Sequence, residues 1–445
     1  WDELQKADSV ILGLKTAPES IEDNTIIAHY LPEFRQQDLR KISEAHCRAA
    51  YSHFNPSDLD RSGAMPRAVD ARLRVGYLLA DARNHANGYN TVLLFGKHDR
   101  QRFEVFVFST GPNDHGWVRA QIEREAEHFV DLFGQTNQAI AQRIHDDRID
   151  ILVDLMGHTS MTRLGALAYR PAPIQITWLG YPGTTGASFV DYIIGDPVVT
   201  PADAFEGYTE RIIRLPHTYQ INNLQTYALK EAPTRSSLGL PEKEFVFCCF
   251  NNPNKLNRER FTAWMSILKA CPGSVLWLNT GLEEARYNLQ QEATRMGIES
   301  RRLIFSAPKE RADYLASMQA ADLFLDTSPC GAHTTASDAL WAGLPVLTVL
   351  GNTFASRVCA SLLQAANLPE LIMPDESAYV AKAIAWAHDS SELRALRHRL
   401  AETKAALPLF DAESRVRESE VAYTQLWRDH RVGKEGLNTP LRSAS

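Results

Sequence analysis

The sequence lacks the patterns that mark several common classes of protein. No GxGxxG or GxxxxGK[ST] pattern follows a strand-like run, which argues against a dinucleotide-dependent oxidoreductase and a P-loop nucleotidase. No apolar run approaches the roughly 18–20 residues of a membrane span, and the N-terminus lacks the basic start and apolar stretch of a signal peptide. We therefore expect no membrane span and no secretion.

Cysteine is scarce and scattered. The six cysteines form no CxxC pair, so the paired spacing of a structural zinc site is missing, and a reduced, cytoplasmic compartment is expected. The one Asp-x-Asp tripeptide, Asp58-Leu-Asp60, could hold a metal that bridges a diphosphate. It lies in a linker-like stretch rich in Pro, Gly and Ser, however, and we expect no metal and no other cofactor.

Basic residues are not in excess. The chain has 47 Lys and Arg against 54 Asp and Glu, a net charge of −7. A surface that follows nucleic-acid phosphates needs the opposite balance, so we expect no nucleic-acid partner, although a local basic pocket for one small anion is compatible with this charge. The length of 445 residues indicates two or three domains at about 100–200 residues each.

From residue 72 onward, apolar runs of strand length alternate with helical stretches. A first series of expected strands covers residues 73–79, 103–109, 151–157, 173–180, 191–196 and 211–216. A second series covers residues 245–251, 274–280, 302–307, 323–327 and 345–351. This alternation is typical of parallel sheets covered by helices. We predict an α/β fold of two doubly wound, Rossmann-like domains that face a cleft and bind ligands at the carboxyl ends of their strands.

The flanks of the two series predict the domain boundaries. Residues 1–70 form an N-terminal helical segment, 71–230 and 231–389 form the two Rossmann-like domains, and 390–445 form a helical tail. Because the chain begins with Trp1 rather than Met, we expect a longer parent protein; whether a repeat array precedes this segment is left open. The oligomeric state is left open.

The segment LFLDTSPCGAHTTASDALWAG, residues 323–343, ends a strand, makes a Pro/Gly turn and begins a helix near Thr334. His333, Thr334 and Thr335 then lie at a helix N-terminus, where unpaired N–H groups and the helix dipole suit a phosphate. The spacing of Thr335 and Asp338 fits a capping box. An ordinary capped helix explains the same pattern and, on this segment alone, is the favoured interpretation.

Two further loops follow expected strands. Lys255 lies in the polar loop of CCFNNPNKLNRERF, residues 248–261, and could neutralise a leaving diphosphate there, or could be a solvated surface lysine. His85 follows the strand of residues 73–79 and could act as a base or orient an acceptor. With fourteen histidines in the chain, a structural role for His85 is the more common alternative.

A fourth segment, residues 170–197, has Gly180, Gly183 and Gly186 after a strand. Glycines there let the backbone approach a ligand closely, and a tight turn between strands explains them equally well. His145 and His158 are weaker candidates.

Together these segments resemble the catalytic region of the protein O-GlcNAc transferase family, bacterial members especially. The resemblance runs from about Asn24 to about His430 and rests on RPAPIQITWLGYPGTTGA, CCFNNPNKLN, SVLWL, DLFLDTSPCGAHTTASDALWAG and GNTFASRV, in this order. It implies a GT-B fold and an inverting, metal-independent transfer of a sugar from a nucleotide donor to a Ser or Thr hydroxyl of a protein. Family members commonly carry tetratricopeptide repeats upstream, which select protein substrates.

The resemblance also implies roles for single residues. On the donor side, the matching positions contact the diphosphate, the ribose or the base: Asn252, Lys255, Arg311, Tyr314, His333, Thr334, Thr335 and Asp338. The catalytic pair would be Lys255, at the diphosphate, and His85, beside the reacting centre. On the sugar and acceptor side, Leu179 and Gly180 match the family's sugar-side loop, and Tyr181 and His145 are further candidates from the sequence itself.

Two positions depart from the animal members of the family. Tyr314 stands where those members have a histidine against the uracil, and Arg311 stands where they have a lysine; an aromatic ring stacks on a base in either case. GHT at residues 157–159 looks more like the SPINDLY-type O-fucosyltransferases, which use GDP-fucose, but those replace the histidine of AHTT by threonine. His333 therefore favours a UDP-sugar, with UDP-GlcNAc preferred over UDP-glucose.

Two rival hypotheses use the same fold. A nucleotide-sugar epimerase would turn over a UDP-sugar without a protein acceptor. A degenerate transferase would bind the nucleotide sugar as a scaffold without transfer. The presence of both Lys255 and His333 argues against degeneration.

Overall fold

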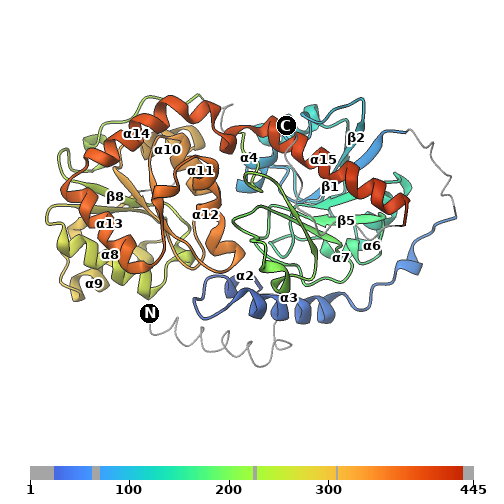
Figure 1. Ribbon diagram of the computed structural model, residues 1–445, viewed down its shortest axis with the longest axis horizontal. Helices are drawn as coiled ribbons and strands as arrows, with labels where there is room; N and C mark the ends of the chain where they lie inside the picture. The colour runs from blue at the N-terminus through green and yellow to red at the C-terminus, as the bar shows by residue number, and fades with distance from the viewer. Residues whose placement is uncertain (1–24, 63–70, 224–227, 307–308, 434–445) are drawn as a thin grey trace. The chain divides into compact units, whose positions relative to one another are not determined.

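The computed structural model describes residues 25–62, 71–223, 228–306 and 309–433, so the part of the predicted N-terminal helical segment before residue 25 lies outside it. The chain divides into two compact units. Of the described residues, the N-terminal unit comprises 25–29, 33–223 and 411–433, and the C-terminal unit comprises 30–32, 228–306 and 309–410. Figure 1 shows a sheet with helices around it in each unit.

The N-terminal unit has a sheet of seven parallel strands in the order β3-β2-β1-β4-β5-β6-β7. The strands are β1 (Leu73–Leu79), β2 (Phe103–Ser109), β3 (His128–Asp131), β4 (Ile151–Asp154), β5 (Ile174–Thr177), β6 (Tyr192–Gly195) and β7 (Arg211–Arg214). All six strands of the first predicted series are confirmed. The sequence reading missed β3, a short edge strand whose residues are all partly or fully exposed.

The helices of this unit connect or flank the strands. They are α2 (Thr25–Ala28), α3 (Gln36–Tyr51), α4 (Ala86–Thr91), α5 (Trp117–Glu125), α6 (Asn137–Asp146), α7 (Leu164–Leu167) and α15 (Ala412–Arg431). Leu39, Ile42 and Cys47 on α3 are buried and recur every three to five residues, as the amphipathic pattern predicts.

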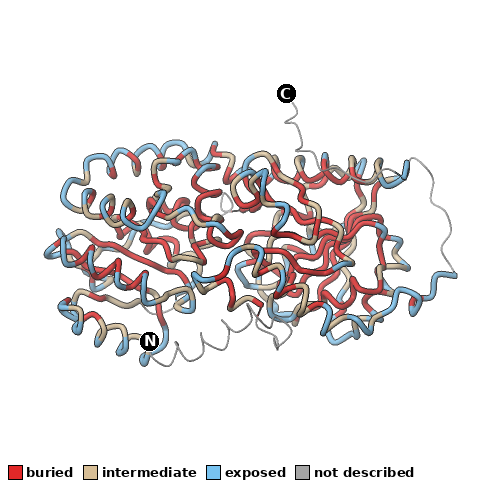
Figure 2. The backbone as a smooth tube through the Cα atoms, turned by 60° about the horizontal axis from the view of Figure 1, so that its bottom comes forward, coloured by how far each residue is buried: buried red, intermediate tan, exposed pale blue. Residues whose placement is uncertain are grey.

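The C-terminal unit has six parallel strands in the order β10-β9-β8-β11-β12-β13. They are β8 (Val246–Cys249), β9 (Val275–Asn279), β10 (Leu303–Ser306), β11 (Leu323–Leu325), β12 (Val346–Val349) and β13 (Ile372–Met373). The second predicted series is confirmed, and β13, only two residues long, was missed. Both sheets are built from mostly apolar runs because parallel strands are covered on both faces; Figure 2 shows most of their strands as buried.

Seven helices of the C-terminal unit are α8 (Arg258–Ala270), α9 (Glu283–Arg295), α10 (Arg311–Met318), α11 (Thr334–Trp341), α12 (Phe354–Ala365), α13 (Glu376–His388) and α14 (Ser391–Thr403). Helices α8 and α13 pack together, and α11 packs between α10 and α12. Helix α14 belongs to this unit, whereas α15 belongs to the N-terminal unit.

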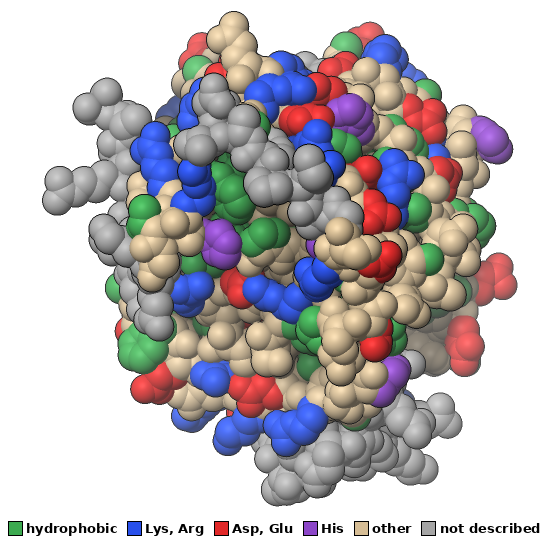
Figure 3. All heavy atoms as spheres, turned by 90° about the vertical axis from the view of Figure 1, so that its right-hand side faces the viewer, with side chains coloured by type: hydrophobic (Ala, Val, Ile, Leu, Met, Phe, Trp, Pro, Cys, Tyr) green, Lys and Arg blue, Asp and Glu red, His purple; other side chains and the backbone are tan. Residues whose placement is uncertain are grey.

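No helix within the described ranges is both long and apolar enough to cross a membrane. On the face of the molecule shown in Figure 3, basic and acidic side chains are interspersed.

A buried polar chain fixes α15 to the sheet of the N-terminal unit. Glu420 accepts hydrogen bonds from His98 Nδ1 at 3.0 Å and from the Asp99 backbone N–H at 2.7 Å. Since a carboxylate only accepts, His98 Nε2 is left to accept from the hydroxyl of Tyr77, 2.8 Å away. Burial raises the pKa of Glu420, but these bonds and Arg417 outweigh it and hold the pKa below its usual value.

We predict that Glu420→Ala destabilises the N-terminal unit by about 3 kcal/mol, because it leaves a buried histidine and a backbone N–H without their partner. Urea unfolding followed by circular dichroism measures the change. Glu413→Ala removes a glutamate of the same helix whose side chain is 64% exposed, and it should cost less than about 0.5 kcal/mol. Equal effects of the two substitutions would contradict the prediction.

Candidate active site

A buried carboxylate organises the carboxyl edge of the C-terminal sheet. Asp326, directly after β11, is only 1% exposed. It accepts hydrogen bonds from Asn251 Nδ2 at 3.0 Å, the Ala332 N–H at 2.7 Å and Thr348 Oγ1 at 2.7 Å. Asn251 follows β8, and Thr348 belongs to β12. One side chain therefore ties together the ends of three adjacent strands.

Lys255 lies on the loop after β8, where residues 253–255 form a single 3-10 turn that the Asn252 side chain caps. Its Nζ donates to the Gly331 carbonyl oxygen at 2.7 Å, on the turn that follows β11. Burial raises the pKa of the neighbouring Cys330 thiol, and the charge of Lys255 partly offsets this rise. The half-buried ammonium group thus lies against the turn that leads into α11, whereas Asn252 is exposed.

Helix α11 begins at Thr334, with His333 as the preceding residue. His333 Nε2 lies 3.2 Å from the Ala355 carbonyl oxygen, so this nitrogen carries the proton when the bond is made. His333, Thr334 and Thr335 are all partly exposed at the positive end of the helix dipole. The predicted capping box of Thr335 and Asp338 is wrong, because the N-cap is His333, so the helix starts two residues earlier than that motif requires, and the Asp338 carboxylate pairs with Arg311.

Asp338 forms a two-pronged ion pair with Arg311, at the start of α10. One of its oxygens lies 2.6 Å from a guanidinium nitrogen, and the second oxygen contacts the other terminal nitrogen. Asp338 is 2% exposed; burial raises its pKa, and Arg311 opposes this rise. In this structure the carboxylate faces Arg311.

The Tyr314 ring, one turn further along α10, completes this cluster. Its centroid lies 5.9 Å from the Arg311 guanidinium carbon and 6.1 Å from the ring of Phe250. The starts of α10 and α11 both follow the carboxyl ends of parallel strands, so the Arg311 cluster and the Lys255 turn occupy the same edge of the sheet. The structure thus brings the sequence-predicted donor residues to one edge.

His85 occupies the corresponding edge of the N-terminal sheet. It precedes α4, its side chain is 47% exposed, and its Nδ1 lies 3.0 Å from Asp81 Oδ2 and 3.3 Å from the Asn87 N–H nitrogen. Asn87 Nδ2 donates in turn to the Leu155 carbonyl oxygen at 2.8 Å, on the loop after β4. The adjacent strands β1 and β4 therefore support the loop that carries His85.

The predicted sugar-side loop follows β5 at this same edge. Leu179 has a φ of +76°, and a Cβ on Gly180 would lie 2.2 Å from the Leu155 carbonyl oxygen, so only glycine fits there. Tyr181 is 4% exposed, and its hydroxyl is 2.9 Å from His29 Nε2. Leu179 and Gly180 are partly accessible, whereas the Tyr181 side chain is buried.

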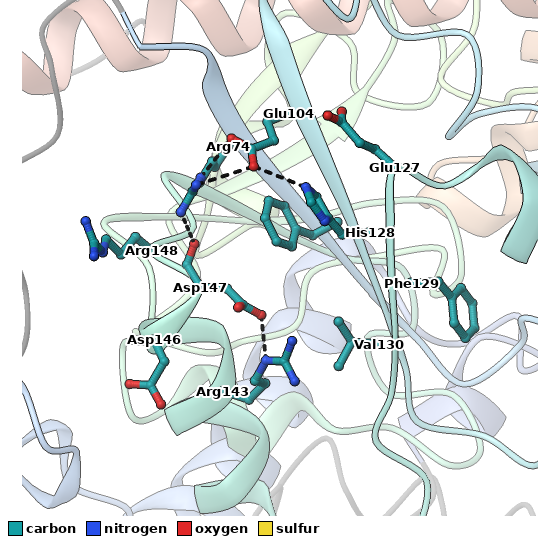
Figure 4. Close-up of a pocket in the computed structure, with 11 residues that line it drawn as sticks. Arg74, Glu104, Glu127, His128, Phe129, Val130, Arg143, Asp146, Asp147 and Arg148 are labelled. Carbon is teal, nitrogen blue, oxygen red and sulfur yellow. Dashed lines mark hydrogen bonds and ion pairs between the residues drawn. The ribbon is translucent and has the colours of Figure 1, made fainter.

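His145 lies away from these residues. It belongs to the last turn of α6, which leads into the amino end of β4, so it lies at the opposite edge of the sheet from His85. A cavity of about 610 Å³ opens at that edge, and no sequence-predicted site residue lines it. Figure 4 shows that its walls are ion-paired: Arg74 contacts Glu104, and Arg143 contacts Asp147.

Asp58 and Asp60 lie in the stretch that follows α3. Asp58 ends a short 3-10 turn, and Asp60 accepts from the Ser62 N–H and hydroxyl. Within the described ranges, no group of three or more His, Cys, Asp or Glu side chains is arranged to hold a metal ion.

Sequence reasoning missed the supporting carboxylates. Asp81, Asp154, Asp196 and Asp326 each end or closely follow an apolar strand, and all four are at most 4% exposed. An aspartate at the end of an apolar run was a usable signal, since a buried carboxylate there must bind the N–H groups of the next turn.

Two Rossmann-like units with polar side chains gathered at the carboxyl edges of their sheets make up a GT-B fold. An O-GlcNAc transferase of Thermobaculum terrenum has the same fold, with a TM-score of 0.84 and 31% identity over 92% of this chain and 77% of that one.

The particular family follows from the sequence. The model of glycosyl transferase family 41 matches residues 53–231 and 228–418, and the chain belongs to this family. A probable UDP-N-acetylglucosamine–peptide N-acetylglucosaminyltransferase, SEC of Arabidopsis thaliana, is 33% identical over 98% of this chain and 46% of its own length. SPINDLY of rice, named with the same probable activity, is 31% identical over 82% of this chain and 40% of its own length. The chain thus spans about half the length of these relatives.

His158 adds a titrating group beneath the sugar-side loop. Its Nε2 lies 2.6 Å from the Thr185 carbonyl oxygen, which can only accept, and its buried Nδ1 has no hydrogen-bond partner. Burial lowers the pKa of His158 to about 4, the bond to Thr185 opposes this, and His46 adds to the lowering. The folded protein therefore binds fewer protons here than the unfolded chain, whose histidines titrate near pH 6.5.

We predict that this group makes the protein less stable as the pH falls from 6.5 towards 4, by about 1.4 kcal/mol per pH unit. His158→Gln keeps a donor for Thr185 and cannot titrate, so its unfolding free energy should fall less steeply over this range. His53→Gln, at an exposed histidine, should follow the wild-type slope. Urea unfolding at a series of pH values measures the slopes, and identical slopes for wild type and His158→Gln would refute the assignment.

Proposed function

We propose that this chain is the catalytic region of an inverting, metal-independent transferase that moves GlcNAc from UDP-GlcNAc to Ser or Thr hydroxyls of proteins. The observation that carries the proposal is the position of Lys255 Nζ, 2.7 Å from the Gly331 carbonyl on the turn that leads into the His333–Thr335 helix start. A cation and a helix N-terminus at one point suit a diphosphate.

The donor would bind along the carboxyl edge of the C-terminal sheet. Lys255 and the start of α11 would hold the two phosphates, with Asn252 near them, and Tyr314 would stack on the base. The Arg311–Asp338 pair beside Tyr314 would orient the nucleoside. For this, the ion pair would rearrange so that Asp338 contacts the ribose. The names of the SEC and Thermobaculum relatives support GlcNAc as the sugar.

The reaction would be a direct displacement at the anomeric carbon. The bond from this carbon to the β-phosphate oxygen breaks while its bond to the acceptor Oγ forms on the opposite face, which inverts the configuration. The hydroxyl proton passes to a base, for which His85 is the candidate, and Leu179 and Gly180 would border the sugar. Negative charge grows on the leaving UDP, where Lys255 and the α11 helix end would stabilise it.

We predict that Lys255→Ala lowers kcat by about 10²–10³-fold, because it removes a preorganised charge from the leaving group. Lys269→Ala, at an exposed lysine of α8, should leave kcat unchanged. Steady-state transfer assays measure both variants, and thermal unfolding checks that each is folded. Near-normal turnover by a folded Lys255→Ala protein would remove Lys255 from the mechanism.

The donor is tested by intact mass spectrometry of acceptor proteins co-expressed or incubated with the chain. UDP-GlcNAc should add one N-acetylhexosamine, whereas UDP-glucose and GDP-fucose should add little. Addition of deoxyhexose from GDP-fucose would replace the proposal by fucosyl transfer, as in the SPINDLY-type resemblance. Conversion of the UDP-sugar without an acceptor would indicate an epimerase, and binding without any conversion would indicate a scaffold.

A further inference from the structure

We propose that Asp81 is the positioning residue for His85. Its carboxylate accepts the N–H of His85 Nδ1, and this bond fixes the imidazole tautomer that leaves the lone pair of Nε2 open to the acceptor hydroxyl. The inference deepens the function proposed above and rests on it for the role of the hydroxyl. The bond itself is a property of the N-terminal unit alone.

Two neighbours compete for His85 Nδ1. The Asp81 Oδ2 atom lies 3.0 Å away, and the Asn87 backbone nitrogen lies 3.3 Å away. A protonated Nδ1 can donate to the carboxylate, whereas an unprotonated Nδ1 can accept only from Asn87. Because a bond to an ionised oxygen is about twice as strong as a neutral one, and because two lone pairs 3.0 Å apart repel, the arrangement favours the proton on Nδ1.

The loop holds Asp81 rigidly enough for this role. Asp81 is 4% exposed, and its second oxygen lies 3.1 Å from a terminal nitrogen of Arg83. A Cβ on Gly88 would lie 2.5 Å from the Asp81 carbonyl oxygen and 2.2 Å from the Arg83 carbonyl oxygen. Helix α4 can therefore pack against this loop only with glycine at position 88. Asp114, on the loop after β2, fixes the loop from the other side by accepting from the Asn84 N–H at 2.8 Å.

The other imidazole nitrogen is available. The ring is about half exposed, and within the described ranges no side chain or backbone group forms a hydrogen bond with Nε2. During transfer the acceptor proton would move to Nε2 as the Oγ bond to the sugar forms and UDP leaves. The buried Asp81 carboxylate would then stabilise the resulting imidazolium, which an amide at this position cannot do.

The test uses Asp81→Asn in the full chain. The Asn side chain has nearly the same shape, but its NH₂ group can donate to Nδ1 and so favours the opposite tautomer. Nitrogen-15 NMR of histidine-labelled protein, with His85→Gln to assign the signal, reports which nitrogen carries the proton. We expect the proton on Nδ1 in the wild type and on Nε2 in Asp81→Asn, together with a kcat lowered by about 10²-fold or more and an unchanged KM for the donor.

Asp114→Asn is the matched control, since it removes a carboxylate that binds the loop of His85 through the Asn84 N–H but does not contact the imidazole. In this variant the His85 tautomer should be that of the wild type. A wild-type proton on Nε2, or the same tautomer in wild type and Asp81→Asn, would overturn the proposal. If the wild type transfers no sugar from any donor, the proposed function fails, but the NMR result still decides the role of Asp81.

Discussion

The buried carboxylate of Asp326 is the constraint on which the C-terminal unit depends. A carboxylate that is 1% exposed is tolerated only when donors surround it. Asn251, Ala332 and Thr348 supply them from three different strand ends. The same crowding requires glycine at position 331, where a Cβ would lie 2.8 Å from Asp326 Oδ2. The turn that Asp326 shapes is the turn whose carbonyl Lys255 contacts, so the geometry of the proposed phosphate site follows from one buried charge.

The N-terminal unit also has buried aspartates at its strand ends that bind the turns that follow. Asp154, at the end of β4, accepts from the Gly157 and Met156 N–H groups, and burial still raises its pKa to about 6. Asp81, which follows the adjacent strand β1, contacts Arg83 and His85 in the same way. In both sheets, aspartates that sequence reasoning passed over hold the loops that carry the residues it selected.

The sequence predicted the strands well where the chain is apolar on both faces, and poorly where it is not. Strands such as β1 and β2 are mostly apolar and have five consecutive buried residues, and their predicted bounds agree with the structure. The missed strands β3 and β13 are short and partly exposed, so their pattern does not differ from that of a loop. The family resemblance was confirmed, because several long segments in a fixed order carry far more information than one spacing.

The partners of single side chains could not be predicted. The spacing of Thr335 and Asp338 fits a local capping motif, but Asp338 instead pairs with Arg311, 27 residues earlier, because α10 and α11 pack together. His145 lies on an amphipathic helix whose direction, rather than its sequence, places it at the amino edge of the sheet. Such contacts depend on tertiary packing, which no pattern of neighbouring residues encodes.

We propose above all that the Lys255 turn and the start of α11 form a diphosphate site. Isothermal titration of the chain with UDP and with uridine tests it most directly, because the two ligands differ only in the phosphates. We expect UDP to bind at least about 100-fold more tightly than uridine, a difference of roughly 2.7 kcal/mol. Equal affinities, or no binding of UDP, would contradict it.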